Sequence, residues 1–148
     1  MDNPLILERN FDVMNKKYVT GVSYDIVGCA IKVHKSLGVG LLESVYQECL
    51  RYELIQKGYS VRRQQKVPLI YDGKDLEIDL RFDLLVNECV VVEIKAIENL
   101  LPVHEAQVYT YMKLLEVPQG LLINFFSKNI SNTTRPLVNE YFKALPDE

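Results

Sequence analysis

The chain has 148 residues, a length that suits one domain with a substantial core. Hydrophobic residues make up 48% of it and charged residues 25%, which excludes disordered and fibrous classes. A formal net charge of −3 excludes general electrostatic attraction to nucleic acid, so any polyanion would need a local basic patch or metal ions.

The cysteines and the hydropathy of the chain further limit the class of protein and its expected compartment. Cys29, Cys49 and Cys89 have no paired spacing typical of a zinc site, and we expect reduced, buried thiols. No apolar run is long enough to span a bilayer, and the first residues lack the apolar core of a signal peptide. We therefore expect a cytoplasmic protein with no membrane partner.

The first half of the domain is predicted to be helical. Residues 1–20 show little periodicity, and we expect a loosely held N-terminal arm before a single domain over residues 21–148. A helix is predicted to begin near Ser23, as its N-cap, and to end before Gly38. A second helix is predicted over residues 41–57, where apolar residues recur at helical spacing.

Strands are predicted next. Residues 60–66 form one strand, and residues 67–71 continue it or begin a second, for which Pro68 favours an edge position. Asp72-Gly73 predicts a two-residue hairpin turn with positive φ at both positions. Residues 76–86 alternate between apolar and charged side chains, which predicts one continuous strand.

A short β-branched run, residues 90–95, predicts a buried central strand. A helix from His104 or Glu105 to Glu116, a strand over residues 119–125, a short strand near residues 134–138 and a terminal helix follow. This order predicts an α/β fold in which helices flank a mixed sheet.

Two charges interrupt the central strand. Glu93 and Lys95 lie two residues apart and therefore point to the same face. Buried charges need partners, so the pair is either an ion pair at the end of the strand or part of a metal site. Asp83, on the adjacent antiparallel strand, would add a second carboxylate if it lay opposite Glu93.

The loop between these two strands decides that question. A two-residue turn at Asn87-Glu88 would place Asp83 and Glu93 on opposite faces of the sheet. We therefore predict a three-residue connection over residues 87–89, or an equivalent bulge.

Such a site would suit a hard divalent ion. Asp83, Glu93 and the Ile94 carbonyl, together with water, offer the oxygen ligands that Mg²⁺ prefers, and Mn²⁺ is expected to substitute. Lys95 would orient or deprotonate a water molecule, or stabilise charge that develops on a phosphate.

At these residues the sequence resembles the PD-(D/E)xK nuclease superfamily. The resemblance rests on Asp83 and on Glu93-Ile94-Lys95, although Phe82 stands where the superfamily usually has proline. It implies a restriction-endonuclease-like core of a helix, three strands, a helix and a strand.

Four further segments resemble one branch of that superfamily, the bacterial and archaeal GxxExxY protein family. They are residues 33–38, Gly40–Tyr46 in the pattern Gly-x-x-Glu-x-x-Tyr, residues 102–107 and residues 120–125. The resemblance covers residues 22–126.

The same resemblance implies roles for two helix residues. It implies that Glu43 reaches the metal site from its helix and binds a second ion or a water there, and that Gln107 accompanies the Glu-x-Lys strand. The alternatives are a surface glutamate at a helix start and a solvated glutamine. His34 and His104 are interpreted as structural or peripheral.

The function implied by the resemblance is a divalent-metal-dependent nuclease that hydrolyses phosphodiester bonds in nucleic acid, with DNA as the expected substrate. Arg62, Arg63 and Lys66 would hold a phosphate backbone, or form only a solvated strand face. One alternative is a catalytically inactive binding module, and another is a subunit of a larger nucleic-acid-processing or defence complex. A homodimer would let two sites cut both strands.

Overall fold

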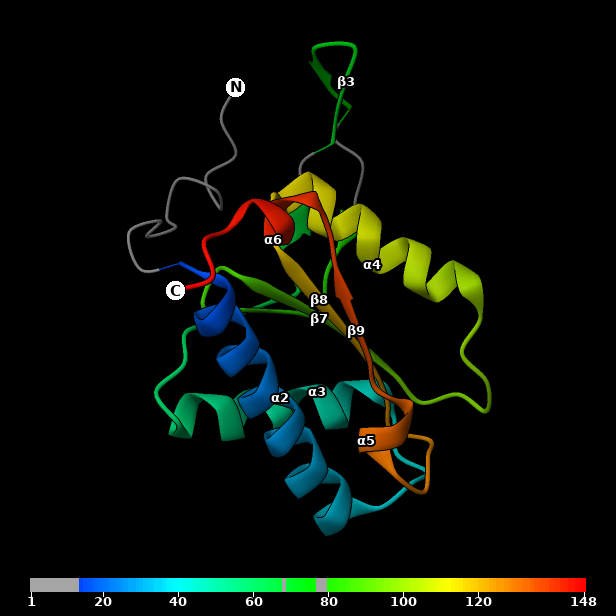
Figure 1. Ribbon diagram of the computed structural model, residues 1–148. Helices are drawn as coiled ribbons and strands as arrows, with labels where there is room; N and C mark the ends of the chain where they lie inside the picture. The colour runs from blue at the N-terminus through cyan, green and yellow to red at the C-terminus, as the bar shows by residue number, and fades with distance from the viewer. Residues whose placement is uncertain (1–13, 68, 77–79) are drawn as a thin grey trace.

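The computed structural model describes residues 14–67, 69–76 and 80–148 (Figure 1). The helices are α2 (Lys16–Leu37), α3 (Glu43–Gln56), α4 (Pro102–Leu115), α5 (Ile130–Thr133) and α6 (Glu140–Ala144). The strands are β1 (Val61–Arg63), β2 (Lys66–Val67), β3 (Ile70–Tyr71), β4 (Lys74–Asp75), β5 (Leu80–Arg81), β6 (Leu84–Val86), β7 (Val90–Lys95), β8 (Gln119–Asn124) and β9 (Arg135–Val138).

The predicted central strand lies at the centre of the main sheet. Five strands follow the order β1-β6-β7-β8-β9, and β7 pairs antiparallel with β6 and parallel with β8. α4 lies between β7 and β8 in sequence and provides the crossover that a parallel pair requires. The predicted α/β fold, a mixed sheet flanked by helices, is confirmed.

Helices cover both faces of this sheet, α2 and α3 on one and α4 on the other (Figure 1). The alternating strand residues divide between two apolar clusters. The cluster beneath α2 and α3 includes Leu84, Val86, Val90, Val92, Ile94, Leu121 and Ile123. The cluster beneath α4 includes Leu85, Val91, Leu122, Val108, Met112 and Leu115. Glu93 lies between Val92 and Ile94, so it points to the α4 side.

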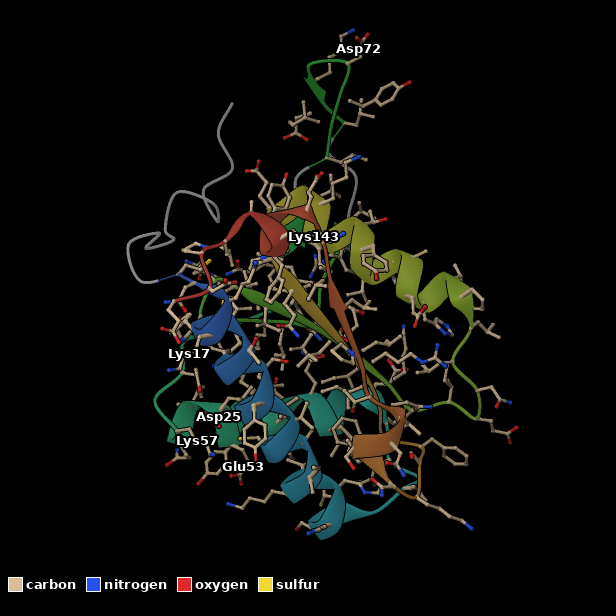
Figure 2. All side chains as sticks on the ribbon, viewed as in Figure 1. Lys17, Asp25, Glu53, Lys57, Asp72 and Lys143 are labelled. Atoms are coloured by element: carbon tan, nitrogen blue, oxygen red, sulfur yellow. The ribbon has the colours of Figure 1, made fainter. Side chains whose placement is uncertain are left out.

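The two helices on the first face are also joined by ion pairs at their exposed edges. Lys32 contacts Glu53 at 2.9 Å, and Lys57 contacts Asp25 at 4.0 Å. Figure 2 shows Asp25, Glu53 and Lys57 gathered where α2 and α3 lie against one another. Exposed pairs of this kind add little stability, so the apolar cluster is what holds the helices to the sheet.

On the other face, α4 comes very close to β8 at Gly120. A Cβ atom at this position would lie 2.5 Å from Val108 Cγ1 and 2.9 Å from Met112 Sδ. The absence of a side chain therefore sets how closely α4, with its polar residues, approaches the sheet.

The first helix begins earlier than predicted. α2 starts at Lys16, where the Asn15 side chain accepts a hydrogen bond from the Tyr18 N–H at 2.7 Å. Ser23 is not the N-cap but lies buried inside the helix, where its hydroxyl accepts a 3.0 Å hydrogen bond from Gln119 Nε2. Residues 16–20, expected to belong to the arm, are thus helical, and the arm expected over residues 1–13 lies outside the described residues.

The predicted continuous strand over residues 76–86 is wrong in the part described. β5 pairs with β2, whereas β6 pairs with β1 and β7. Phe82 packs in the cluster beneath α4 and Leu84 in the cluster beneath α2 and α3, so the alternation is interrupted at Asp83. Residues 77–79 and the edge position predicted for Pro68 lie outside the described residues.

The predicted hairpin turn at Asp72-Gly73 is confirmed. Asp72 and Gly73 have φ of 53° and 73°, and Tyr71 pairs directly with Lys74 across them. The β3–β4 hairpin extends away from the sheet (Figure 1), and Figure 2 shows Asp72 at its tip.

The helix after the central strand also begins earlier than predicted, at Pro102. Proline suits the first turn because its missing N–H would have no partner there. His104 Nδ1 accepts the Leu101 N–H at 2.9 Å, which agrees with a structural role for this histidine.

Two expectations from composition can be compared with the structure. Cys29 and Cys89 are buried thiols outside any disulfide, as predicted, whereas Cys49 is only partly buried. Across the described ranges, no helix combines the length and apolarity needed to cross a membrane.

Candidate active site

The connection between β6 and β7 has the predicted three residues. Val86 pairs with Val90 and Leu84 with Val92, where the ladder ends; continuing this register by one residue sets Asp83 opposite Glu93. Asn87 and Glu88 adopt left-handed backbone conformations, with φ of 47° and 57°, that close the loop. The prediction that Asp83 lies opposite Glu93 on one face is therefore confirmed.

At this pair, hydrogen bonds to side chains replace the usual backbone hydrogen bonds between the two strands. The Asp83 N–H donates to Glu93 Oε1 at 3.0 Å, and the Ile94 N–H donates to Asp83 Oδ2 at 2.8 Å. The Asp83 carbonyl meanwhile accepts the N–H of Gln64, whose φ is 46°, at 3.0 Å. These bonds explain why the strand pattern breaks at Asp83, and they fix both carboxyl groups in place.

Burial and proximity perturb both acids. Burial, and secondly the negative charge of Asp83, raise the pKa of Glu93 to about 8, although the Asp83 N–H and the Lys95 charge oppose this. Burial also raises the pKa of Asp83, against the lowering effects of the Ile94 N–H and Lys95. Because like charges at this distance resist joint ionisation, the two carboxyls share one proton at neutral pH in the metal-free protein.

The Lys95 side chain lies near both carboxylates. It is partly buried, and its positive charge lowers the pKa of Asp83 and of Glu93. In the described part of the chain it forms neither a hydrogen bond nor an ion pair within 4 Å. The ammonium group is therefore close to the site yet available to a water molecule or a phosphate.

Glu43 is the first residue of α3 and is exposed. After burial, which is the largest cause, its negative charge also raises the pKa of Asp83, so the Glu43 carboxylate acts on the site through its charge. In the described part of the chain Glu43 forms no hydrogen bond or ion pair with either carboxyl group, so it lies at the margin of the site.

The Ile94 carbonyl faces the same region. The Ile94 N–H points towards β6, because it donates to Asp83. Since the N–H and C=O of one strand residue point to the same side, the carbonyl also points towards the Asp83 side of β7.

On the α4 side of the sheet, buried Tyr111 lies near the site and is held by the exposed Gln107. Gln107 Nε2 donates to the Tyr111 hydroxyl at 3.1 Å, and Tyr111 is 4% exposed. Burial, and then the charges of Glu93 and Asp83, raise the pKa of Tyr111. Tyr111 was not among the predicted site residues, although its spacing of four residues from Gln107 on one helix predicts a shared face.

The oxygen donors fit a hard divalent cation. Within the described ranges no group of three or more His, Cys, Asp or Glu side chains is arranged to hold a metal ion. Asp83 and Glu93 nevertheless offer adjacent carboxylates, the Ile94 carbonyl faces them, and their shared proton marks a place where positive charge is favoured. Glu43 does not complete a three-carboxylate group in this arrangement.

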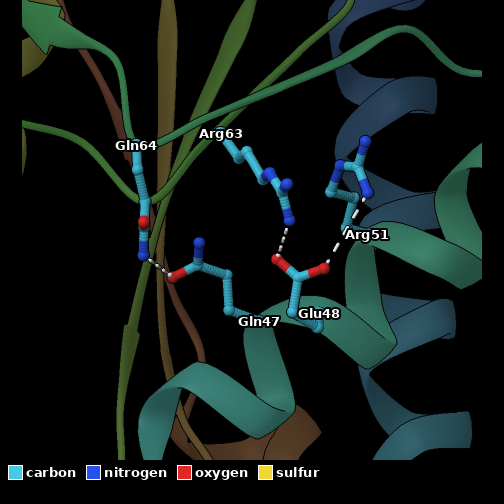
Figure 3. A network of polar contacts seen from close by, with 5 residues as sticks. All are labelled: Gln47, Glu48, Arg51, Arg63 and Gln64. Atoms are coloured by element: carbon cyan, nitrogen blue, oxygen red, sulfur yellow. Dashed lines mark hydrogen bonds and ion pairs between the residues drawn. The ribbon is translucent and has the colours of Figure 1, made fainter.

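The basic residues of β1 already have acidic partners. Arg62 forms an ion pair with Glu88, and Arg63 Nη1 contacts Glu48 Oε1 at 2.6 Å. Figure 3 shows Glu48 between Arg63 and Arg51, which lies 3.8 Å from its other oxygen. Lys66 is exposed on β2. Phosphate binding by Arg62, Arg63 and Lys66 stays a prediction, and for the two arginines it would require exchange of an existing partner.

Comparison with known proteins adds one finding. Residues 20–136 match a sequence family described as the PD-(D/E)XK nuclease superfamily. Searches of the curated proteins and of the solved structures gave no match.

Proposed function

Because the chain belongs to the PD-(D/E)XK nuclease superfamily, we propose that it hydrolyses phosphodiester bonds of nucleic acid, with Mg²⁺ as its cofactor and DNA as its substrate. The observation that carries this proposal is the pair of half-buried Asp83 and buried Glu93 on one face, with Lys95 beside them. We also propose membership of the GxxExxY branch, on the segments Gly40–Tyr46 and 120–125.

In this proposal Asp83, Glu93 and the Ile94 carbonyl hold the divalent ion. The ion, when bound, supplies positive charge for the phosphate oxygens. Binding it requires the proton shared by the two carboxyls to leave, so ion binding and deprotonation are linked. Glu43, at the margin of the site, would support a second ion or orient a water.

The remaining residues act on the attacking water and the phosphate. Lys95 holds the water whose oxygen forms the new bond to phosphorus, and this water releases a proton to solvent. The bond from phosphorus to the leaving sugar oxygen breaks, and that oxygen takes a proton from solvent. Gln107 holds the Tyr111 hydroxyl, and this pair limits the access of solvent to Glu93 from the α4 side.

The proposal is tested with the purified chain and a panel of single- and double-stranded DNA and RNA. We expect cleavage with Mg²⁺ or Mn²⁺ and none with EDTA, and a metal-induced rise in melting temperature. Asp83→Asn should remove both responses, whereas Lys95→Ala should remove cleavage alone.

Each other outcome has a defined meaning. If the wild-type chain shows no metal-induced melting shift and no cleavage, the nuclease proposal is refuted. A melting shift without cleavage would favour the alternatives, an inactive binding module or a subunit that needs a partner chain.

A further inference from the structure

The segment that leads into α3 needs an anchor that the helix itself does not provide. The chain reverses at Gly38 and Gly40, whose φ values of 70° and 99° disfavour other residues. α3 then begins with Leu42 as N-cap, a residue whose side chain cannot accept a hydrogen bond. The first turn, which carries Glu43, would therefore be free to fray.

Tyr46 supplies the missing anchor from one turn further along. Its hydroxyl donates to the Gly38 carbonyl at 2.6 Å and accepts the Leu41 N–H at 3.2 Å. The Tyr46 side chain is fully buried, so its hydroxyl would lose both partners without replacement if the segment moved away. One hydroxyl thus joins both ends of the reversal that precedes Glu43.

The ring of Tyr46 connects the same segment to the end of β7. It stacks on Phe125, with ring centroids 4.4 Å apart and planes inclined by 14°. The Phe125 N–H donates to the Lys95 carbonyl at 2.8 Å. Asn124, the preceding residue, holds the chain just after Lys95, through bonds of 3.1 and 2.7 Å to the Ile97 N–H and carbonyl.

We propose that Tyr46 is a positioning residue, which fixes Glu43 relative to the end of β7 that carries Glu93 and Lys95. Its hydroxyl sets the path of residues 38–41, and its stacked ring sets the distance from that path to β7. This inference rests on the proposed nuclease function, since it gives Glu43 a part in that reaction.

The test compares Tyr46→Phe with Tyr59→Phe. Each change deletes one tyrosine hydroxyl that donates a hydrogen bond. The Tyr59 hydroxyl, however, donates to Asp25 on α2, away from the proposed site. We expect faster amide hydrogen exchange at Leu41 in Tyr46→Phe only. In metal-dependent cleavage we expect kcat to fall about ten- to hundredfold in Tyr46→Phe with KM unchanged, because small displacements of a catalytic group carry losses of that size.

A double-mutant cycle with Glu43→Gln separates positioning from general stability. If Tyr46 acts through Glu43, adding Tyr46→Phe to Glu43→Gln should lower kcat no further. Multiplicative losses, or an equal fall of kcat in Tyr59→Phe, would overturn the inference while leaving the nuclease function intact.

The exchange measurement keeps the two proposals distinguishable. If the wild-type chain does not cleave, the proposed function fails, and exchange at Leu41 then decides only whether Tyr46 holds the path of residues 38–41. Unchanged exchange there in Tyr46→Phe overturns the inference about Tyr46.

Discussion

The shared proton of Asp83 and Glu93 predicts how the stability of the metal-free protein depends on pH. Glu93→Gln removes one ionisable group while preserving the hydrogen bonds around it. The amide oxygen would still accept the Asp83 N–H, and the amide N–H would donate to the Asp83 carboxylate as protonated Glu93 does. The variant is therefore a permanent mimic of the protonated state.

The magnitude follows from the pKa of Glu93, which burial and the Asp83 charge raise from 4.5 to about 8. The folded protein thus binds this proton more tightly than the unfolded chain. The resulting stabilisation is complete below pH 4.5 and is lost as pH rises from 4.5 to about 8. The loss is about 5 kcal/mol at most, because a pKa change of one corresponds to about 1.4 kcal/mol.

Urea unfolding followed by circular dichroism in EDTA, between about pH 5 and pH 9, measures this effect. We expect Glu93→Gln to match wild type near pH 5 and to exceed it by about 2–5 kcal/mol near pH 9. The difference between the two proteins cancels the titration of distant groups. With Mg²⁺ present, the difference should shrink. If the difference in the free energy of unfolding does not grow with pH, Asp83 and Glu93 do not share a proton.

Four further changes test other parts of the structure. Asp83→Asn should raise metal-free stability at alkaline pH, because it deletes one of the repelling charges, whereas Lys95→Ala should lower it; thermal melts in EDTA at pH 8 compare them. Gly120→Ala should cost about 1–3 kcal/mol in urea unfolding, because α4 must move away from β8, and an unchanged stability would contradict the close contact. Lys66→Ala should weaken DNA binding and reduce its salt dependence if β2 contacts phosphate, and unaltered binding in fluorescence anisotropy would remove Lys66 from that surface.

Sequence periodicity predicted the elements that are fixed by burial, and missed those that are fixed by particular polar contacts. The β-branched run over residues 90–95 identified β7 because a buried strand needs little else. The start of α2 was missed because Asn15 caps a turn with weak periodicity. The continuous strand over residues 76–86 was wrong because the Asp83 carboxylate takes the Ile94 N–H, a local bond that alternation does not reveal.

The candidate site could be predicted in part because strand geometry has a period of two. Requiring Asp83 opposite Glu93 was enough to predict the loop length, and the structure confirms it. The position of Tyr111 could not be obtained in this way, because it depends on how closely α4 approaches β8 at Gly120. The distance of Glu43 from the carboxylate pair likewise depends on helix packing, which no local pattern encodes.

The hydrogen bonds that the Asp83 and Glu93 side chains accept from the neighbouring strand have an evolutionary consequence. Selection for folding alone would retain a carboxyl or amide at both positions, since each side chain accepts an N–H of the neighbouring strand. Lys95 forms no such hydrogen bond within the described chain and contributes only its charge beside the two carboxyls, so it is the least constrained of the three once catalysis ceases to matter. In descendants that lose activity, Lys95 should therefore be substituted before Asp83 or Glu93. A homologue with both acids but no lysine would have lost its activity recently.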